Sequence, residues 1–365
     1  MATQAPDASR TEVSGEEEVR TLTDTADLAA KVGATPRDGP TSSASVKADQ
    51  PPPAHAAMAG AGSAPDKGVV SPYTETPHSP FAIDGVAVAN APALPPPVLS
   101  EANDPNPVWR PTDEDAHVHG QLRVGGAAPR DYYFFAVFDG HGGGAASKFV
   151  SGRIWNHLAS RLAASEPLEQ SITEAFFDAD EELRTGCDHQ NAGSTGAVAL
   201  LTSGQQAAEW ALTVANCGDT RVVLSARNRV VRLSTDHSPA VPSERERIER
   251  AGGWVASDRV IGVLAVSRAF GNFEMKELCP PTPTISQVLL RGKPRQRWAR
   301  FLIIACDGLW DVMSDSEAVS FVKRNAEAAH ASGSEDPLGV AARTLVEEAL
   351  DRGTTDNVTV QVIFF

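Results

Sequence analysis

The sequence predicts an α+β fold, an α/β sandwich in which helices cover antiparallel β-sheets. Short β-branched and apolar runs, separated by Gly, Asn and polar turns, follow one another between residues 197 and 233, which is typical of antiparallel strands. Pairs of segments with apolar residues at helical spacing stand before and after these strands. Because helices come in pairs between runs of strands, a parallel doubly wound sheet is not expected.

The chain begins with a segment that is not expected to fold. Residues 1–80 are rich in Ala, Pro and Ser and poor in large apolar residues, so they cannot bury enough surface to offset their ordering entropy. We predict a disordered tail there and a folded domain over 81–365. Within that domain we expect a strand at Phe81–Val88, a proline-rich insertion over about 91–107 and a core over 108–365. Four residues precede a proline and would suit phosphorylation, but plain linker composition is the favoured interpretation: Thr35, Ser71, Thr76 and Ser79.

The first half of the core alternates a strand, two helices and further strands. Tyr132–Phe138 is an apolar and aromatic strand that ends at Asp139. Two segments with helical periodicity follow, and Ser165 is expected to cap the second. Four short strands then form a predicted antiparallel meander. The segments are Ala145–Leu162 and Leu168–Leu183 for the helices, and Ala197–Leu201, Trp210–Ala215, Arg221–Ser225 and Val230–Leu233 for the strands.

The second half contains three predicted helices and two predicted strands. A capping box of Ser243 and Glu246 should start the first helix, and one of Ser314 and Glu317 should start the second. Pro337 suits the first turn of the third helix. The helices are Ser243–Ala251, Ser314–His330 and Pro337–Asp351, and the strands are Phe301–Cys306 and Asn357–Phe364.

Four acids share one structural context, because each stands at the end of a predicted strand beside Gly or Asn. A single turn acid is ordinary, but four of them suggest carboxylates that converge on one place. Such carboxylates repel one another unless cations lie between them, and all-oxygen ligands favour Mg²⁺, Mn²⁺ or Ca²⁺ over zinc. The four are Asp139, Asp219, Asp307 and Asp356.

The stretch WRPTDEDAH adds further polar candidates before the first strand. If it is extended, Arg110 and Glu114 lie on one side and Asp115 on the other, so a phosphate-binding guanidinium and a metal-binding carboxylate can share a pocket. His117 and His119 form an HxH pair of the kind that binds metal. A surface strand is the favoured interpretation of that pair, because no third ligand stands nearby in the sequence.

Composition limits the classes of function. The chain has 365 residues, 41% of them hydrophobic, and a formal charge of −15, which disfavours nucleic acid and anionic membranes as partners. No apolar run approaches the length of a membrane span, which is about 20 residues. Cys187, Cys217, Cys279 and Cys306 include no CxxC pair and indicate reduced thiols. We expect a soluble monomer in the cytoplasm or nucleus.

Motifs over residues 108–365 resemble those of the metal-dependent Ser/Thr protein phosphatases of type 2C, the PPM family. They occur in the family's order: WRPTDEDAH, FFAVFDGHGGG, AGSTG, ANCGDTR, STDHSP, ERIERAGGWV, LAVSRAFGN, ACDGLWDVMSD and TTDNVTV. The resemblance implies two antiparallel β-sheets packed face to face with helix pairs outside, a four-layer αββα arrangement. It also implies phosphorylated proteins as partners and a role in signalling.

The resemblance also implies roles for individual residues. Two Mg²⁺ or Mn²⁺ ions would bridge a water that attacks phosphorus in line, and Asp219 with Asp307 matches a separate, weaker third metal site. Arg110 matches the residue that holds the phosphate, and His141 matches the general acid for the departing oxygen. The matching metal positions are Glu114, Asp115, Asp139, Gly140 through its carbonyl, Asp219, Asp307 and Asp356.

Some positions depart from the family pattern. Asn272 replaces the usual acid after SRAFG, and Thr284 replaces a usual Glu. Two other classes of function compete with the enzyme: a pseudophosphatase that uses the cleft to bind a partner, and a structural Ca²⁺-binding protein. The complete set of separate, mutually repelling acids favours a phosphatase over both, because Ca²⁺ loops cluster their acids in one short segment.

Overall fold

The computed structural model describes residues 19–20, 96–124, 130–164, 167–186, 191–204, 209–226, 229–291 and 299–365. Several predictions lie outside these residues: the tail over 1–80 apart from residues 19–20, the strand at Phe81–Val88, the proline-directed sites, the Ser165 cap and Cys187. Among the described residues, no helix is both long enough and apolar enough to cross a membrane. Cys217, Cys279 and Cys306 are free and buried, as the sequence predicted.

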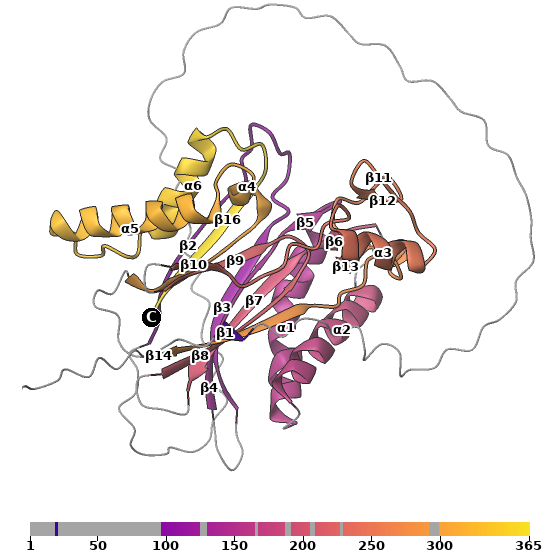
Figure 1. The fold of residues 1–365 in the computed structure, drawn as a ribbon, viewed down its shortest axis with the longest axis horizontal. Coiled ribbons are helices and arrows are strands. Elements are labelled where there is room, and N and C mark those ends of the chain that lie inside the picture. Colours follow the sequence, from indigo (N-terminus) through magenta and orange to yellow (C-terminus); the bar gives the residue numbers. More distant parts are fainter. Residues whose placement is uncertain are drawn as a thin grey trace, which may run out of the picture. The chain divides into compact units, whose positions relative to one another are not determined.

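Two antiparallel β-sheets form the centre of the fold (Figure 1). The six-stranded sheet has the order β1-β14-β8-β7-β4-β3, and the five-stranded sheet has the order β10-β9-β15-β16-β2. The strands of the first sheet are β1 (Val19–Arg20), β14 (Thr284–Arg291), β8 (Glu209–Cys217), β7 (Gly196–Ser203), β4 (Arg130–Phe138) and β3 (Ala116–Val124). Those of the second are β10 (Arg229–Arg232), β9 (Arg221–Ala226), β15 (Phe301–Ala305), β16 (Val358–Phe364) and β2 (Val98–Asp104).

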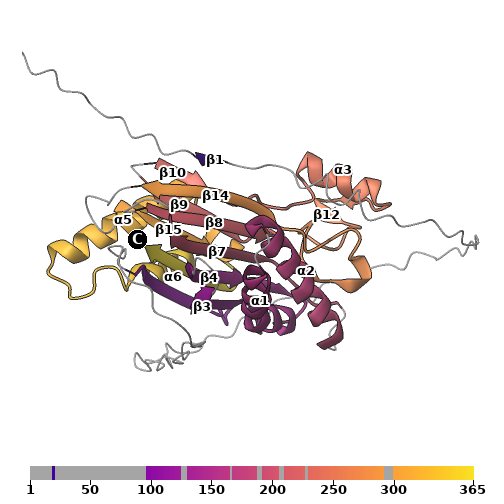
Figure 2. The ribbon, with the colours of Figure 1, turned by 90° about the horizontal axis from the view of Figure 1, so that it is seen from below.

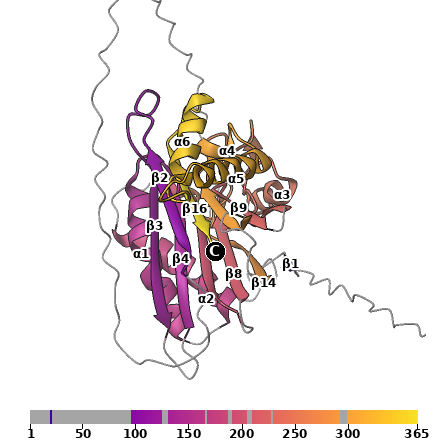
Figure 3. The same cartoon turned by 90° about the vertical axis from the view of Figure 1, so that its left-hand side faces the viewer.

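Helices cover the outer faces of both sheets (Figure 2). α1 (Ala145–Ala163) and α2 (Leu168–Gly186) lie together, with α1 packed on β3 and β4. On the other sheet, α6 (Ala341–Asp351) packs on β2 and β16 beside α5 (Asp315–Ala331), and the short α4 (Asp307–Trp310) follows β15 (Figure 3). This arrangement confirms the predicted α/β sandwich.

Three apolar cores separate the four layers. Phe134, Phe138 and Ile154 belong to the core between the six-stranded sheet and α1 and α2. Leu212 and Ile304 belong to the core between the two sheets. A third core lies beneath α5 and α6. Alternate residues of each central strand therefore face different cores, which explains why these strands are apolar throughout.

A smaller lobe and a short three-stranded sheet complete the fold. The lobe contains α3 (Pro242–Arg250) and the hairpin of β11 (Val255–Ala256) and β12 (Arg259–Val260), with its own small core around Ile248. The short sheet has the order β13-β6-β5. Its strands are β5 (Gly140–His141), β6 (Gly193–Ser194) and β13 (Phe270–Gly271), so it begins directly after Asp139.

The structure corrects the sequence predictions at the start of the domain. Residues 98–104, predicted to lie in a proline-rich insertion, form β2, which pairs with β16 along its whole length. The predicted meander is also wrong as a single sheet: β7 and β8 pair in one sheet, while β9 and β10 pair in the other. The chain crosses between the sheets at Gly218, whose φ of 95° favours glycine.

Two helix starts also differ from prediction, and one is confirmed. α3 begins at Pro242 with Val241 as its N-cap and no side-chain cap, so the Ser243 and Glu246 capping box is wrong. A proline in the first turn has no backbone N–H that a cap would have to satisfy. This explains how the helix starts without a capping box. α6 begins at Ala341, and residues 337–340 form turns. The Ser314 and Glu317 capping box of α5 is confirmed.

Candidate metal centre

Strand order brings two of the predicted acids to one end of the six-stranded sheet. β4 and β8 both pair antiparallel with β7, so β4 and β8 run parallel and end at the same edge. Asp139 follows the end of β4, and Asp219 lies two residues beyond the end of β8. The hydrogen bond from Thr195 N to the carbonyl of Asp139, 2.8 Å long, ties β4 to the start of β7.

The five-stranded sheet supplies two more acids at the same end of the sandwich. β15 and β16 are antiparallel, with Ala305 opposite Val360, so the end of β15 lies beside the start of β16. Asp307 begins α4 just after β15, and Asp356 stands just before β16. The helix after β15 can start here only because Gly308 has no side chain: a Cβ there would lie 2.0 Å from the carbonyl oxygen of Asn357.

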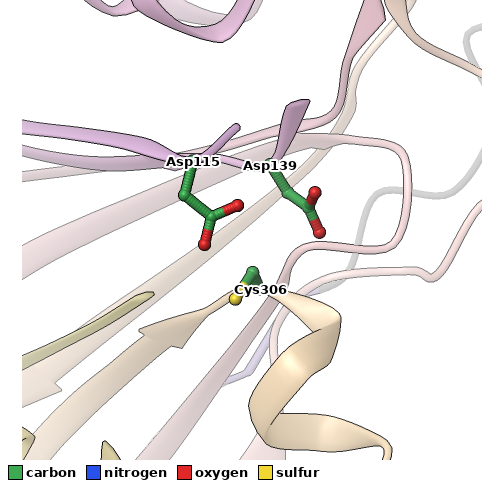
Figure 4. A group of neighbouring side chains, drawn as sticks. All are labelled: Asp115, Asp139 and Cys306. Carbon is green, nitrogen blue, oxygen red and sulfur yellow. The ribbon is translucent and has the colours of Figure 1, made fainter. Parts of the chain in front are cut away.

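Asp115 lies deep between the two sheets (Figure 4). It precedes β3, whose first residue pairs with Phe138, and this register places Asp115 beside Asp139. Ligand atoms of Asp115, Asp139 and Cys306 all lie within 4.8 Å of one another. Thr359 donates a 2.6 Å hydrogen bond from Oγ1 to Asp115 Oδ2. The sequence predicts Asp115 on the side of the stretch opposite to Arg110 and Glu114. The structure places it next to Asp139 and Cys306.

Burial and mutual repulsion raise the pKa of the acids in this group. Burial raises the pKa of Asp139 well above its usual value, and the charges of Asp307, Asp115, Asp219 and Asp356 raise it further. The pKa rises to about 7 for Asp115, to about 8 for Asp219 and to about 6 for Asp307, with burial as the largest cause in each. The structure therefore brings together all five aspartates.

The donor set fits divalent cations such as Mg²⁺ or Mn²⁺. The group offers carboxylate oxygens, which these cations prefer, and its only sulfur belongs to Cys306, whose pKa is raised well above its usual value by burial. Asp307 Oδ1 is buried without a hydrogen-bond partner. A buried oxygen of this kind costs free energy unless a donor or cation satisfies it, so a cation would satisfy both this atom and the excess negative charge.

Gly140 stands where the backbone of the loop before β3 approaches closely. A Cβ at Gly140 would lie 2.3 Å from the carbonyl oxygen of Glu114 and 2.9 Å from Ser147 Oγ, so a side chain is excluded. Glu114 Oε1 accepts a 3.1 Å hydrogen bond from Gly143 N. The structure thus places the Glu114 carboxylate against the loop that follows β5.

Arg110 lies at the mouth of the acid group. Its Nη2 forms an ion pair with Asp356 Oδ2, and its Nε donates a 3.3 Å hydrogen bond to the carbonyl of Thr355. The side chain is 41% exposed, so part of the guanidinium remains accessible from solvent. Its positive charge also lowers the pKa of Asp307. Arg110 therefore stands where an anion approaching the acids would meet it first.

His141 lies beside the group and is held by one of the residues that departs from the family pattern. Its Nε2 is 2.8 Å from Asn272 Oδ1, so a protonated Nε2 donates to this amide oxygen. Burial lowers the pKa of His141, and the charge of Lys276 lowers it further, while Asn272 and Glu114 act against this shift. Asp180 holds the same loop by accepting from Gly271 N and Lys276 Nζ at 2.7 and 2.8 Å.

Thr284, the other departure, has a partner near Asp219. His237 accepts a 3.1 Å hydrogen bond at Nδ1 from Gly218 N, which leaves Nε2 to donate to Thr284 Oγ1 at 2.8 Å. Burial and then the charge of Arg268 lower the pKa of His237 to about 3, so the ring is neutral. Thr284 and His237 together fix the turn that carries Asp219.

Sequence reasoning missed two residues that shape the site. Asp311 raises the pKa of Asp307 and Asp219 by its charge and lines a pocket of about 620 Å³ with Arg221 and Trp310. It lies four residues after Asp307 in DGLWD, and this helical spacing could have indicated it. Asn357 accepts from Glu114 N at 3.0 Å and donates to the carbonyls of Pro105 and Thr112. Only the fold brings these segments together.

The raised pKa values predict how the metal-free chain responds to pH. Asp115 and Asp219 have native pKa values of about 7 and about 8, above the value of about 4 for an unfolded aspartate. The native state therefore holds more protons, and stability is lost as the pH rises through these values. In EDTA, we expect the free energy of unfolding to fall by about 3 kcal/mol between pH 6.5 and 8.5.

Urea unfolding followed by circular dichroism measures this effect. Below pH 6.5, neutral His141 and His237 add a slope of the opposite sign, so the interval is chosen above their ordinary pKa. Asp219→Asn should make the slope shallower. A free energy of unfolding that rises with pH over this interval would contradict the raised pKa values.

Known proteins resemble this chain over the region that forms the site. The family model described as "Protein phosphatase 2C" matches residues 104–358. "Probable protein phosphatase 2C 69" of Arabidopsis thaliana is 38% identical over 67% of this chain and 65% of its own length. "Protein phosphatase 2C homolog 1" of Saccharomyces cerevisiae is 35% identical over 72% of this chain and 92% of its own length.

A solved structure shows the same fold. The crystal structure of a phosphatase from Toxoplasma gondii superposes with a TM-score of 0.62 at 25% identity, over 74% of this chain and 92% of the other. The region that the family model matches extends from the end of β2 to the start of β16. It contains every residue of the acid group described above.

Proposed function

The chain belongs to the protein phosphatase 2C family, and from this membership we propose that it is a metal-dependent phosphatase of phosphoserine and phosphothreonine in proteins. The observation that carries the proposal is the group of five aspartates, which reach one place from separate strands of two sheets. A protein that only bound a partner would gain nothing from five mutually repelling carboxylates, so this observation favours the enzyme over a pseudophosphatase.

We propose that the aspartates hold two Mg²⁺ or Mn²⁺ ions, with a third, weaker site that includes Asp219. Asp139, Asp307 and Asp356 would supply carboxylate oxygens and Gly140 its carbonyl, while Asp115 and Glu114 complete the set from the β3 side. Bound cations of this class lower the pKa of coordinated water and neutralise charge on a phosphoryl group. The protein contributes a rigid frame, because Asp139, Asp307 and Asp356 lie next to the ends of β4, β15 and β16, whose side chains are mostly buried.

Arg110 is proposed to bind the phosphate. A guanidinium presents paired N–H donors that match phosphate oxygens, and its partial exposure leaves it open to a substrate. The Arg110 ion pair with Asp356 places this fork directly beside the acid group. Substrate phosphate would therefore lie between the guanidinium and the aspartates, with its leaving oxygen toward the loop that carries His141.

His141 is proposed to donate the proton to the leaving serine or threonine oxygen. Asn272 holds Nε2 in place, so the ring cannot rotate freely. The lowered pKa makes the protonated ring a stronger acid than an ordinary histidinium, although it is less populated at neutral pH. We also expect the chain to act as a monomer in the cytoplasm or nucleus, with phosphorylated proteins as its partners.

Hydrolysis of a phosphothreonine peptide tests the function directly. With Mg²⁺ or Mn²⁺ we expect release of inorganic phosphate. With excess EDTA we expect release to fall to background, because without cations nothing activates the attacking water or neutralises the charge of the phosphate. Restoring either cation should restore activity. Equal rates with cation and with EDTA would contradict a metal-dependent phosphatase, and no phosphate release in any condition would favour the pseudophosphatase.

The role of His141 is tested by comparing leaving groups. His141→Ala should slow a phosphothreonine peptide by about a hundredfold, because an alkoxide needs a proton as it leaves. The same variant should slow an aryl phosphate much less, since a phenolate leaves without one. His157→Ala is the control, because His157 is paired with Glu182 between α1 and α2. Equal loss on both substrates would remove the general-acid role.

A further inference from the structure

A second cluster of metal-binding side chains lies at the open edge between the two sheets. The sequence shows an HxH pair with no third ligand near it, and the fold supplies that ligand. Glu101 Oε2 on β2 lies 3.1 Å from His119 Nδ1 and 3.9 Å from His117 Nε2, both on β3. β2 is the edge strand of the five-stranded sheet and β3 is the edge strand of the six-stranded sheet.

The three side chains share the layer between the sheets. Val118 and Leu122 of β3 pack in the core beneath α1 and α2, so His117 and His119, which alternate with them, point the other way. On β2, Leu99 packs in the core between the sheets, and Glu101 lies on the same face two residues later. The cluster therefore occupies the edge of the layer between the sheets.

We propose that His117, His119 and Glu101 bind one zinc-class transition-metal ion. Two imidazoles and one carboxylate are a ligand set that suits Zn²⁺ and leaves a fourth position for water. Ligand atoms on a tetrahedral zinc lie roughly 3.3 Å apart at bond lengths of about 2.0 Å. The His119 contact already has this spacing, but the ligand atoms of the three residues do not all lie within 4.8 Å of one another, so His117, whose side chain is 31% exposed, has to rotate toward Glu101 to bind the same ion.

A buried neighbour fixes the carboxylate and leaves one acceptor unsatisfied. Gln361 is fully buried, and its Nε2 donates to Glu101 Oε2 at 3.1 Å and to the carbonyl of Val118 at 3.4 Å. These two acceptors determine the orientation of the amide, so Oε1 faces away from them and has no partner.

The charge state of Glu101 suits a ligand. Burial acts to raise the pKa of Glu101, but the hydrogen bond from His119 and the charges of both histidines outweigh it and lower the pKa. Glu101 is therefore ionised at neutral pH. The acid group differs in kind, since it offers oxygen ligands and one protonated thiol, while this cluster offers two imidazole nitrogens. Zinc-class ions and Mg²⁺ can thus be distinguished by ligand preference.

Zinc binding is measured by isothermal titration calorimetry on the full chain, loaded first with excess Mg²⁺ to occupy the acid group. We expect one Zn²⁺ site in the unmodified chain, and at least about tenfold weaker binding in His119→Gln and in Glu101→Gln. His157→Gln, which removes a histidine paired with Glu182 elsewhere, should bind Zn²⁺ as the unmodified chain does. Equal affinity in all four proteins would overturn the proposal.

Two further measurements keep the test decisive if a variant folds poorly. Zn²⁺ should raise the thermal unfolding midpoint of the Mg²⁺-loaded unmodified chain, because the ion joins the edges of two sheets. Co²⁺ added to the same protein should give the visible absorption of a tetrahedral site with nitrogen ligands. An absorption spectrum of six-coordinate Co²⁺ alone, with no change in the midpoint, would place the ion at the acid group and exclude the edge site.

Discussion

Asp307→Asn is expected to lower kcat/KM for a phosphothreonine peptide by about a thousandfold, equivalent to about 4 kcal/mol of transition-state stabilisation. The substitution keeps the size of the side chain and removes one negative charge from the centre of the acid group. It also replaces the carboxylate whose Oδ1 is buried without a hydrogen-bond partner. Phosphate release at saturating Mn²⁺ measures the loss.

The same variant should make the metal-free fold more stable. Burial, followed by the charges of Asp356 and Asp311, raises the pKa of Asp307 to about 6, so the ionised carboxylate that predominates at neutral pH destabilises the metal-free fold. Removing that charge relieves repulsion, and we expect the thermal unfolding midpoint in EDTA to rise. Activity and stability should therefore change in opposite directions.

Asp315→Asn is the matched control. Asp315 accepts from Arg221 and Arg232 at 3.0 and 2.8 Å, and its pKa is lowered because these arginines outweigh the effect of burial. Losing this charge should destabilise the fold and leave most of the activity. If Asp307→Asn kept full activity at saturating Mn²⁺, or lost stability as Asp315→Asn does, the proposed role of Asp307 would be wrong.

Arg110→Ala is expected to lower kcat/KM by about a hundredfold, because the phosphate loses its charged donors in both the ground and transition states. Arg110→Lys should recover only part of this, since an ammonium is a point charge without the fork. Inorganic phosphate, as a competitive inhibitor, should bind more weakly to both variants. Initial rates over a range of peptide and phosphate concentrations separate these effects.

Arg123→Ala controls for the loss of an exposed arginine. Arg123 pairs with Asp131 at 3.8 Å and is 44% exposed, close to the 41% of Arg110. We expect its kinetics to match those of the unmodified chain. Unchanged inhibition by phosphate in Arg110→Ala would show that another group binds the substrate anion.

Much of the acid group could be predicted from the sequence because it depends on local signals. Asp139 and Asp307 follow apolar strands, and Asp356 precedes one, so their positions come from strand ends that composition reveals. The position of the stretch around Arg110 and Asp115 does not follow from a strand end in the same way. Its position depends on Asn357, whose amide contacts Pro105 and Thr112, and no local pattern predicts contacts across such a separation.

The elements that sequence reasoning missed depend on tertiary contacts. β2 reads VLSEAND, with a proline just before it and acids within it, and it becomes a strand because β16 offers a complete edge for pairing. The division of the meander between two sheets follows from Gly218, which turns the chain with positive φ. Glu101 contacts the HxH pair because it belongs to β2, a strand that the sequence did not predict.

The pairing of β2 with β16 also makes the acid group depend on segments from both ends of the domain. Asp104 pairs with Val358, and Thr359 holds Asp115, so segments from opposite ends of the domain must meet before the acid group is complete. A chain that stops before residue 356 lacks both Asp356 and β16, the strand whose Thr359 holds Asp115. A chain truncated before residue 356 should therefore lack a complete acid group, and the proposed phosphatase activity would require both ends of the domain to be in place.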